Sequence, residues 1–121
     1  MNKRLLGSQA EYLVSKTLTA NGYRVCERNY YSHLGEIDLI AEKNEWLVFI
    51  EVKSRHDHDL MAAAESVTWK KQQKIIRTAQ YYLLKHKLGS VACRFDVICV
   101  TNARAAHPDI HWIKNAFVNG C

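Results

Sequence analysis

Two strand-like segments separated by a short turn constrain the fold of this chain more than any other feature of its sequence. Residues 36–42 and 46–54 are rich in β-branched and aromatic side chains, and the polar residues 43–45 between them are typical of a tight turn. This pattern predicts a β-hairpin. If its strands pair symmetrically about the turn, Asp38 lies directly opposite Glu51.

The hairpin register also sorts the side chains by polarity, because successive residues of a strand point to opposite faces of the sheet. The predicted apolar face carries Ile37, Leu39, Ile50 and Val52, and the predicted charged face carries Glu36, Asp38, Glu51 and Lys53. Two carboxylates opposite each other on an open sheet destabilise it by up to about 1 kcal/mol. A raised carboxyl pKa or a bound divalent cation would relieve this repulsion. The alternative is a solvated sheet face with a simple ion pair between Glu36 and Lys53.

The remaining hydrophobic periodicity predicts two helices and three further strands. The predicted helices cover residues 8–20 and 65–87, the further strands cover residues 23–31, 95–101 and 110–117, and a loop covers residues 56–64. The resulting order is α-β-β-β-α-β-β. Together with the length of 121 residues, this order predicts a single α/β domain over residues 1–121, with a mixed central sheet flanked by helices.

The charge balance of the chain is compatible with a polyanionic partner such as nucleic acid. There are 17 Lys and Arg residues against 12 Asp and Glu residues, which gives a net charge of +5. No apolar run approaches the roughly 20 residues of a membrane span, and the first basic residues are not followed by the apolar segment of a secretory signal. We therefore expect a cytoplasmic protein that does not enter a membrane, with its four cysteines as reduced thiols.

Basic residues of the second predicted helix are candidates for contact with nucleic acid. The candidate contacts are Arg55, Lys70, Lys71, Gln72, Lys74 and Arg77. Ser66 or Thr68 would cap the helix that carries most of them. Because no recognition-helix or zinc-finger pattern is present, we expect contacts to DNA backbone and shape rather than to base sequence. The alternative is an ordinary solvated helix face. Asp96 is expected to form an ion pair with Arg94 or a hydrogen bond at the end of its strand rather than to join a site.

The acidic residues of the hairpin resemble a known nuclease motif. Asp38 followed by Glu51-Val52-Lys53 is similar to the PD-(D/E)xK motif of nucleases with the restriction-endonuclease-like fold. Over most of its length the chain resembles the YraN-like family of small bacterial proteins, which are themselves similar to the archaeal Holliday junction resolvases. The matching strings are Gly7-Ser8-Gln9-Ala10-Glu11, Glu27-Arg28-Asn29-Tyr30, Gly35-Glu36-Ile37-Asp38-Leu39-Ile40-Ala41, Val48-Phe49-Ile50-Glu51-Val52-Lys53-Ser54-Arg55, Val67-Thr68, Lys71-Gln72 and Arg94-Phe95-Asp96-Val97.

This resemblance implies a restriction-endonuclease-like core and a metal-dependent nuclease that hydrolyses DNA phosphodiester bonds. It implies that Asp38, Glu51 and Glu11 hold Mg²⁺ or Mn²⁺ and that Lys53 acts on the attacking water, so these four residues are the expected catalytic set. It also implies a branched or junction substrate and a homodimer. The alternative role for Glu11 is to interact with the N-terminal end of its helix dipole. The competing hypothesis is a non-catalytic nucleic-acid-binding or adaptor protein that retains the nuclease fold, and RNA is the competing substrate.

Overall fold

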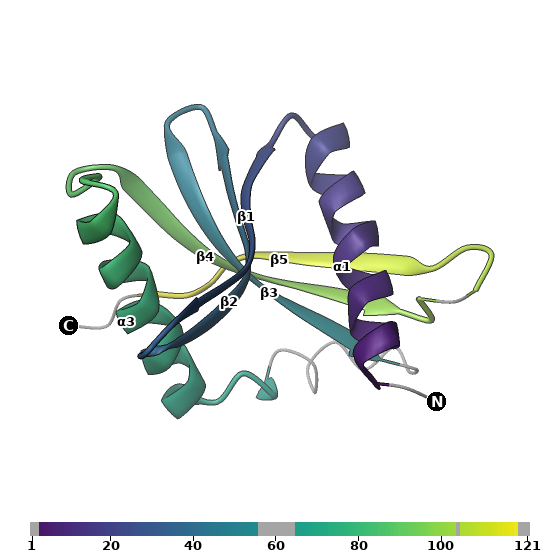
Figure 1. Cartoon of the computed structure of the whole chain (residues 1–121). Coiled ribbons are helices and arrows are strands. Elements are labelled where there is room, and N and C mark those ends of the chain that lie inside the picture. Colours follow the sequence, from purple (N-terminus) through teal and green to yellow (C-terminus); the bar gives the residue numbers. More distant parts are fainter. Residues whose placement is uncertain (1–2, 56–64, 104, 119–121) are drawn as a thin grey trace.

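The computed structural model describes residues 3–55, 65–103 and 105–118, in which a five-stranded sheet lies between two helices (Figure 1). The elements are α1 (Lys3–Ala20), β1 (Arg24–Ser32), β2 (Gly35–Lys43), β3 (Trp46–Arg55), α3 (Trp69–Lys85), β4 (Ala92–Thr101) and β5 (Asp109–Phe117). Their order confirms the predicted α-β-β-β-α-β-β arrangement of an α/β domain with a mixed sheet.

The five strands lie side by side in the order β1-β2-β3-β4-β5. Strands β3 and β4 are parallel, whereas every other neighbouring pair is antiparallel. Parallel neighbours need a crossover connection rather than a tight turn, and α3 lies in the connection between β3 and β4. The loop expected over residues 56–64 lies outside the described residues.

The two helices cover opposite faces of the sheet and create two hydrophobic cores (Figure 1). On one face, Val14 and Leu18 of α1 are buried against Leu39 and Ile50. The core on the other face includes Ile40, Phe49, Phe95, Ile75, Ile76, Ala79 and Tyr82, of which the last four belong to α3. Alternating residues of β3 enter the two cores, so both faces of this strand are buried.

This burial overturns the expectation of one apolar and one charged hairpin face. In the middle of the hairpin both faces are apolar, because each is covered by a helix. Ile37 packs in the α3-side core and Leu39 in the α1-side core, although the simple alternation placed them on the same face. The alternation of side chains between the two faces of β2 is therefore broken at Asp38. Asn29 lies between the β1 partners of these two residues and has a left-handed φ of 50°.

The predicted hairpin register is confirmed from the turn to the middle of the strands. Pairing runs from Lys43 with Trp46 to Leu39 with Ile50. The central turn residues, 44 and 45, both have positive φ, at 51° and 69°. Two such residues in succession characterise the type I′ turn, which matches the twist of antiparallel strands. The paired register ends at Leu39 and Ile50, just before the acidic residues.

The helix boundaries differ from those predicted at three ends. Helix α1 begins at residue 3 rather than 8, and α3 covers residues 69–85 rather than 65–87. Thr68 is the N-cap of α3, and its hydroxyl accepts a hydrogen bond from the Lys71 backbone N–H at 3.2 Å. An apolar pattern marks a helix face but not its first hydrogen-bonded turn, so the cap rather than the pattern determines where α3 begins.

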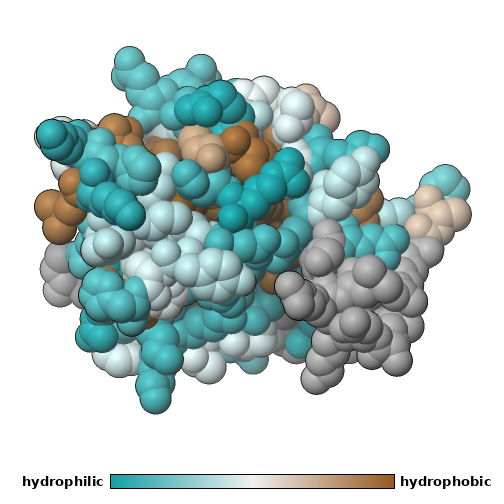
Figure 2. All heavy atoms as spheres, viewed as in Figure 1, coloured by the Kyte–Doolittle hydropathy of each residue, from teal (hydrophilic) through white to brown (hydrophobic). Residues whose placement is uncertain are grey.

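The face of the molecule shown in Figure 2 is largely hydrophilic, with smaller apolar areas. This is consistent with helices that bury one stripe against the sheet and expose the other to solvent. Neither helix in the part of the chain that the structure describes is long and apolar enough to cross a bilayer.

Candidate active site

The acidic motif lies where the ladder between β2 and β3 ends. Beyond the pairing of Leu39 with Ile50, Asp38 and Glu51 are not register partners of each other, although Glu51 remains paired with Val97 of β4. Instead, the Asp38 carboxylate reaches across to β3, and its Oδ2 accepts a hydrogen bond from the backbone N–H of Val52 at 2.8 Å. A side chain therefore takes the place of a backbone carbonyl, and this fixes one of the two acids relative to the other strand.

Glu51 is a buried carboxylate held between two lysines. Its side chain is only 7% exposed, and its Oε1 lies 2.7 Å from the Lys71 ammonium and 3.7 Å from the Lys53 ammonium. Lys53 comes from the same strand, two residues on, whereas Lys71 comes from the first turn of α3. Two cations are thus directed at one oxygen atom, which compensates the cost of burying the Glu51 charge.

Among the residues that the structure describes, no ammonium or guanidinium group forms an ion pair with Asp38. Burial, together with the negative charges of Glu51 and, more weakly, Glu11, raises the pKa of its carboxyl from 3.8 to about 7. The hydrogen bond from Val52 and the charge of Lys71 act in the opposite direction. Close to neutral pH this acid is therefore divided between its protonated and ionised forms.

The two lysines influence each other through their like charges. Burial and the neighbouring Lys71 ammonium lower the pKa of Lys53. Burial opposes the charge on Lys71 too, but its hydrogen bond to Glu51 and the charges of Glu51 and Asp38 outweigh this effect and raise its pKa. Lys53 therefore loses its proton more readily than Lys71 does.

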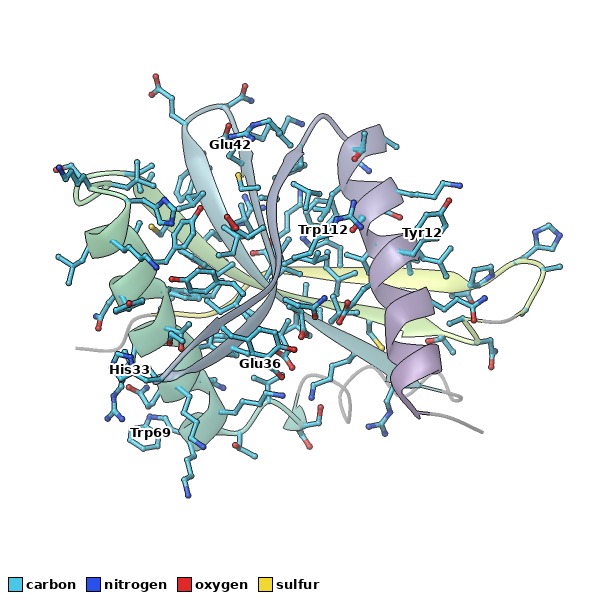
Figure 3. All side chains as sticks on the ribbon, in the orientation of Figure 1. Tyr12, His33, Glu36, Glu42, Trp69 and Trp112 are labelled. Carbon is cyan, nitrogen blue, oxygen red and sulfur yellow. The ribbon has the colours of Figure 1, made fainter. Side chains whose placement is uncertain are left out.

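The sequence predicts that Asp38, Glu51 and Lys53 lie together. In the structure these three side chains are neighbours, since Glu51 forms an ion pair with Lys53 and Asp38 interacts with both through its charge. Glu11, on α1, is half-buried and acts on Asp38 through its charge. Among the described residues, no cluster of three or more His, Cys, Asp or Glu side chains is close enough to hold a metal ion. The alternative ion pair between Glu36 and Lys53 is also not found there. The Glu36 residue is exposed (Figure 3), and its register partner in the β1–β2 ladder is Tyr31.

The two central carboxylates nevertheless have the chemistry that a hard divalent cation requires. Both offer oxygen atoms, Glu51 is buried and Asp38 half-buried, and they repel each other unless a proton or a cation lies between them. Mg²⁺ is commonly held by only one or two protein carboxylates and keeps water in its other positions. Asp38 and Glu51 therefore fit such an ion, with Glu11 as a more distant third acid.

The predicted nucleic-acid contacts separate into two groups in the structure. Lys70, Lys74 and Arg77 are exposed on α3. The other residues have interactions within the chain: the Gln72 side-chain amide donates to the Val67 carbonyl at 3.0 Å, the Arg55 carbonyl accepts from the Asn102 backbone N–H at 3.0 Å, and Lys71 binds Glu51.

The place of Lys71 in the acidic site was not anticipated from the sequence. Its position three residues after the Thr68 cap identified it as a residue of the first helical turn, but not as a partner of Glu51. The two residues are 20 positions apart, and their contact depends on how α3 packs against the sheet. Both helices begin at the same end of the molecule, the end at which β3 finishes (Figure 1). This arrangement directs the N-terminal end of α3 toward the acids.

Asp96 is a buried acid with a structural role, as expected from its neighbour Arg94. It accepts hydrogen bonds from the Arg94 guanidinium at 2.9 Å, the Trp112 indole N–H at 2.7 Å and the Asn115 backbone N–H at 2.9 Å. The Arg94 guanidinium also donates to the Tyr23 hydroxyl at 2.9 Å. This network joins β4 to β5 and to Tyr23, the residue before β1, and it confirms the predicted ion pair.

Comparison with known proteins assigns the chain to a family. The model of "Uncharacterised protein family UPF0102" matches residues 10–100, a range that contains every acid and lysine of the candidate site. A UPF0102 protein of Aliivibrio salmonicida is 40% identical over 121 residues, covering 98% of this chain and 96% of its own. UPF0102 proteins of Saccharophagus degradans and Hahella chejuensis are 44% and 46% identical over 112 residues. They cover 92% and 93% of this chain, and 91% and 89% of their own.

Proposed function

This chain belongs to the UPF0102 family, the YraN family that the motifs indicated, and we propose that it is a metal-dependent nuclease that hydrolyses DNA phosphodiester bonds. The observation that carries the proposal is the gathering of Asp38, Glu51, Lys53 and Lys71 where the β2–β3 ladder ends. Buried carboxylates that repel each other, next to lysines, are typical of sites that bind a cation and act on a phosphate.

Each residue has a role that follows from its surroundings. Asp38 and Glu51 hold Mg²⁺ or Mn²⁺, and Glu11 adds negative charge from α1. When bound, a divalent cation supplies positive charge to the phosphate and makes a water molecule more acidic. Lys53 orients the attacking water by hydrogen bonding, because its ammonium is half-buried beside Glu51. The lowered pKa of Lys53 makes it easier for the Lys53 ammonium to release a proton beside Glu51.

The exposed basic residues of α3 provide the DNA-binding surface in this proposal. Lys70, Lys74 and Arg77 contact backbone phosphates, so affinity falls steeply as salt concentration rises. Such contacts position a duplex without reading its bases. A branched or junction DNA and a homodimer are the substrate and assembly that the resolvase-like motifs favour.

One observation favours the alternative, a DNA-binding or adaptor protein without catalysis. Lys71 already neutralises Glu51 at 2.7 Å, so the Glu51 carboxylate is stable without a metal. A protein that had lost its cation could preserve its fold in this way. The two hypotheses differ in whether cleavage depends on Asp38 and Lys53.

The first test is a cleavage assay on linear, single-stranded, flapped and four-way DNA, together with the same shapes made in RNA. Each substrate is incubated with Mg²⁺, Mn²⁺ or EDTA. We expect cleavage of DNA that EDTA abolishes and that falls by about a hundredfold or more in Asp38→Asn and in Lys53→Met. Faster cleavage of the four-way or flapped DNA would identify the substrate shape.

The control variant is Glu42→Gln. Glu42 lies at the far end of β2 and pairs with the exposed Arg24 at 2.6 Å, so its loss leaves the acidic site unchanged (Figure 3). Metal-independent cleavage, or equal cleavage by wild type and Asp38→Asn, would contradict the nuclease proposal. DNA binding without cleavage of any substrate would favour the adaptor hypothesis.

A further inference from the structure

The ion pair between Lys71 and Glu51 is unequal in its exposure. The Glu51 side chain is 7% exposed, whereas the Lys71 side chain is 43% exposed. The carboxylate is therefore fixed in the protein, but the ammonium that neutralises it lies at the solvent boundary. A long, flexible side chain in such a position can leave its partner without opening the core.

A divalent cation on the two acids would compete directly with this ammonium. Lys71 lies 2.7 Å from Oε1 of Glu51, and Lys53 lies 3.7 Å from the same atom. A doubly charged ion on that carboxylate would repel both ammonium groups. Lys53 is the less exposed of the two lysines, at 21%, and follows Glu51 on the same strand. Lys71 reaches the site from another element and is the one that can move away.

The helix that carries Lys71 provides a destination for the released ammonium. The first turn of α3 contains no acidic residue but includes Lys70 and Lys71 next to the Thr68 cap. Cations are disfavoured at a helix N-terminus by the helix dipole, and an anion placed there reverses this effect. Exposed Lys70 and Lys74 increase the positive charge at this end. A released Lys71 would thus be well placed to bind a phosphate beside the acids.

We propose that Lys71 is an exchangeable counter-ion: it neutralises Glu51 when no metal is bound, and it moves to a DNA phosphate when a divalent cation takes Glu51. The inference rests on the proposed nuclease function. This exchange makes metal binding and DNA binding mutually favourable. A bound metal occupies Glu51 and so releases Lys71 for DNA, and bound DNA holds Lys71 and so leaves Glu51 to the metal. Since such coupling is reciprocal, bound DNA strengthens metal binding by the same factor.

The decisive experiment measures DNA affinity in EDTA, by fluorescence anisotropy with a labelled four-way DNA. Glu51→Gln imitates the effect of the metal, because it removes the charge that holds Lys71. Asp38→Asn, compared at pH 8 where Asp38 is largely ionised, is the matched control: it removes negative charge from the same site but leaves the Lys71–Glu51 pair intact. We expect Glu51→Gln to tighten metal-free binding by about tenfold more than Asp38→Asn does.

The double variant Glu51→Gln/Lys71→Met identifies the cause of that gain. We expect the extra affinity to disappear in the double variant, since no ammonium is left to release. An equal gain with or without Lys71 would overturn the proposal, because it would show only a general loss of negative charge. Lys71→Met alone leaves Glu51 buried without its nearest cation and can be unstable. The double variant carries neither charge, so the comparison between Glu51→Gln and the double variant remains decisive.

A second measurement uses Mn²⁺ alone, with melting temperature and electron paramagnetic resonance as readouts. We expect Lys71→Met to bind Mn²⁺ about tenfold more tightly than wild type, because the competing ammonium is gone. Lys85→Met, an exposed lysine in the last turn of the same helix, should bind Mn²⁺ as wild type does. Weaker Mn²⁺ binding in Lys71→Met would contradict the exchange.

The two proposals can fail separately. Intact coupling between Glu51 and Lys71 without DNA cleavage would overturn the nuclease function but not the exchange. Metal-dependent cleavage without that coupling would overturn the exchange but not the nuclease function.

Discussion

Asp38 and Asp96 lie in the same sheet, the first half-buried and the second fully buried, and their surroundings are opposite. Asp96 has no exposed surface and accepts hydrogen bonds from Arg94, Trp112 and Asn115. Within the described part of the chain, Asp38 accepts one from Val52, and burial together with two further acids raises its pKa. A buried acid whose oxygens all accept hydrogen bonds stabilises a fold, whereas an acid left beside like charges is a candidate for binding a cation or a proton.

The largest expected effect on stability is at Asp96. Asp96→Ala leaves the Arg94 guanidinium without its anion and two N–H groups without their acceptor, so we expect a loss of about 3–5 kcal/mol in the free energy of unfolding. Urea denaturation followed by circular dichroism measures it. A loss below about 1 kcal/mol would remove the contrast between the two acids. Asp109→Asn, at the exposed start of β5, is a surface comparison.

A change of opposite sign is expected at Asp38. Because the pKa of Asp38 is about 7 in the folded protein and ordinarily 3.8, the folded state binds the proton more tightly. The stabilising effect of that proton is complete below about pH 4 and is lost as the pH rises to 7. In EDTA, Asp38→Asn should therefore be more stable than wild type by about 1–3 kcal/mol at pH 8, and the difference should shrink toward pH 4.

The measurement is a series of urea denaturation curves between pH 4 and pH 8. Glu42→Gln, which alters an acid at the far end of β2 that is paired with Arg24, is the surface control. A stability difference for Asp38→Asn that grows as the pH falls would reverse the sign and contradict the assignment of the raised pKa.

The smallest expected effect is at Thr68, whose hydroxyl caps α3. Thr68→Ala removes the acceptor of the Lys71 N–H, and we expect a loss of about 1 kcal/mol in the free energy of unfolding. Thr68→Ser keeps a hydroxyl and should restore most of it. In NMR spectra, amide shifts should concentrate around residues 67–72 and leave the Asp96 network unchanged. Shifts spread equally over both regions would mean that the two are not independent.

The hairpin and its register could be predicted because they depend on local rules. The turn at residues 44 and 45 and the apolar segments of two adjacent strands are continuous in the sequence. The break opposite Asp38 could not be predicted in this way, since it coincides with a left-handed residue, Asn29, on another strand. The sharing of Glu51 by Lys53 and Lys71 required the packing of α3 on the sheet.

The motif therefore predicted where the acids lie but not the ionisation state of the charged groups around them. Asp38 and Glu51-Val52-Lys53 alone predict one charged face of the hairpin but not how far that face is buried. The two helices instead bury both faces, and this burial raises the pKa of Asp38 and lowers that of Lys53. Burial is a property of the whole fold, so the electrostatic state of a motif cannot be inferred from its spacing.

The hydrogen bond between Asp38 and Val52 has a spectroscopic consequence. The Val52 amide proton is held by a side chain whose charge can change, rather than by a backbone carbonyl whose charge cannot. Its chemical shift and its rate of exchange with deuterated water should therefore follow the ionisation of Asp38 and any ion that draws the carboxylate away. A single amide resonance thus reports the state of the site in the intact protein, without a label and without a substrate.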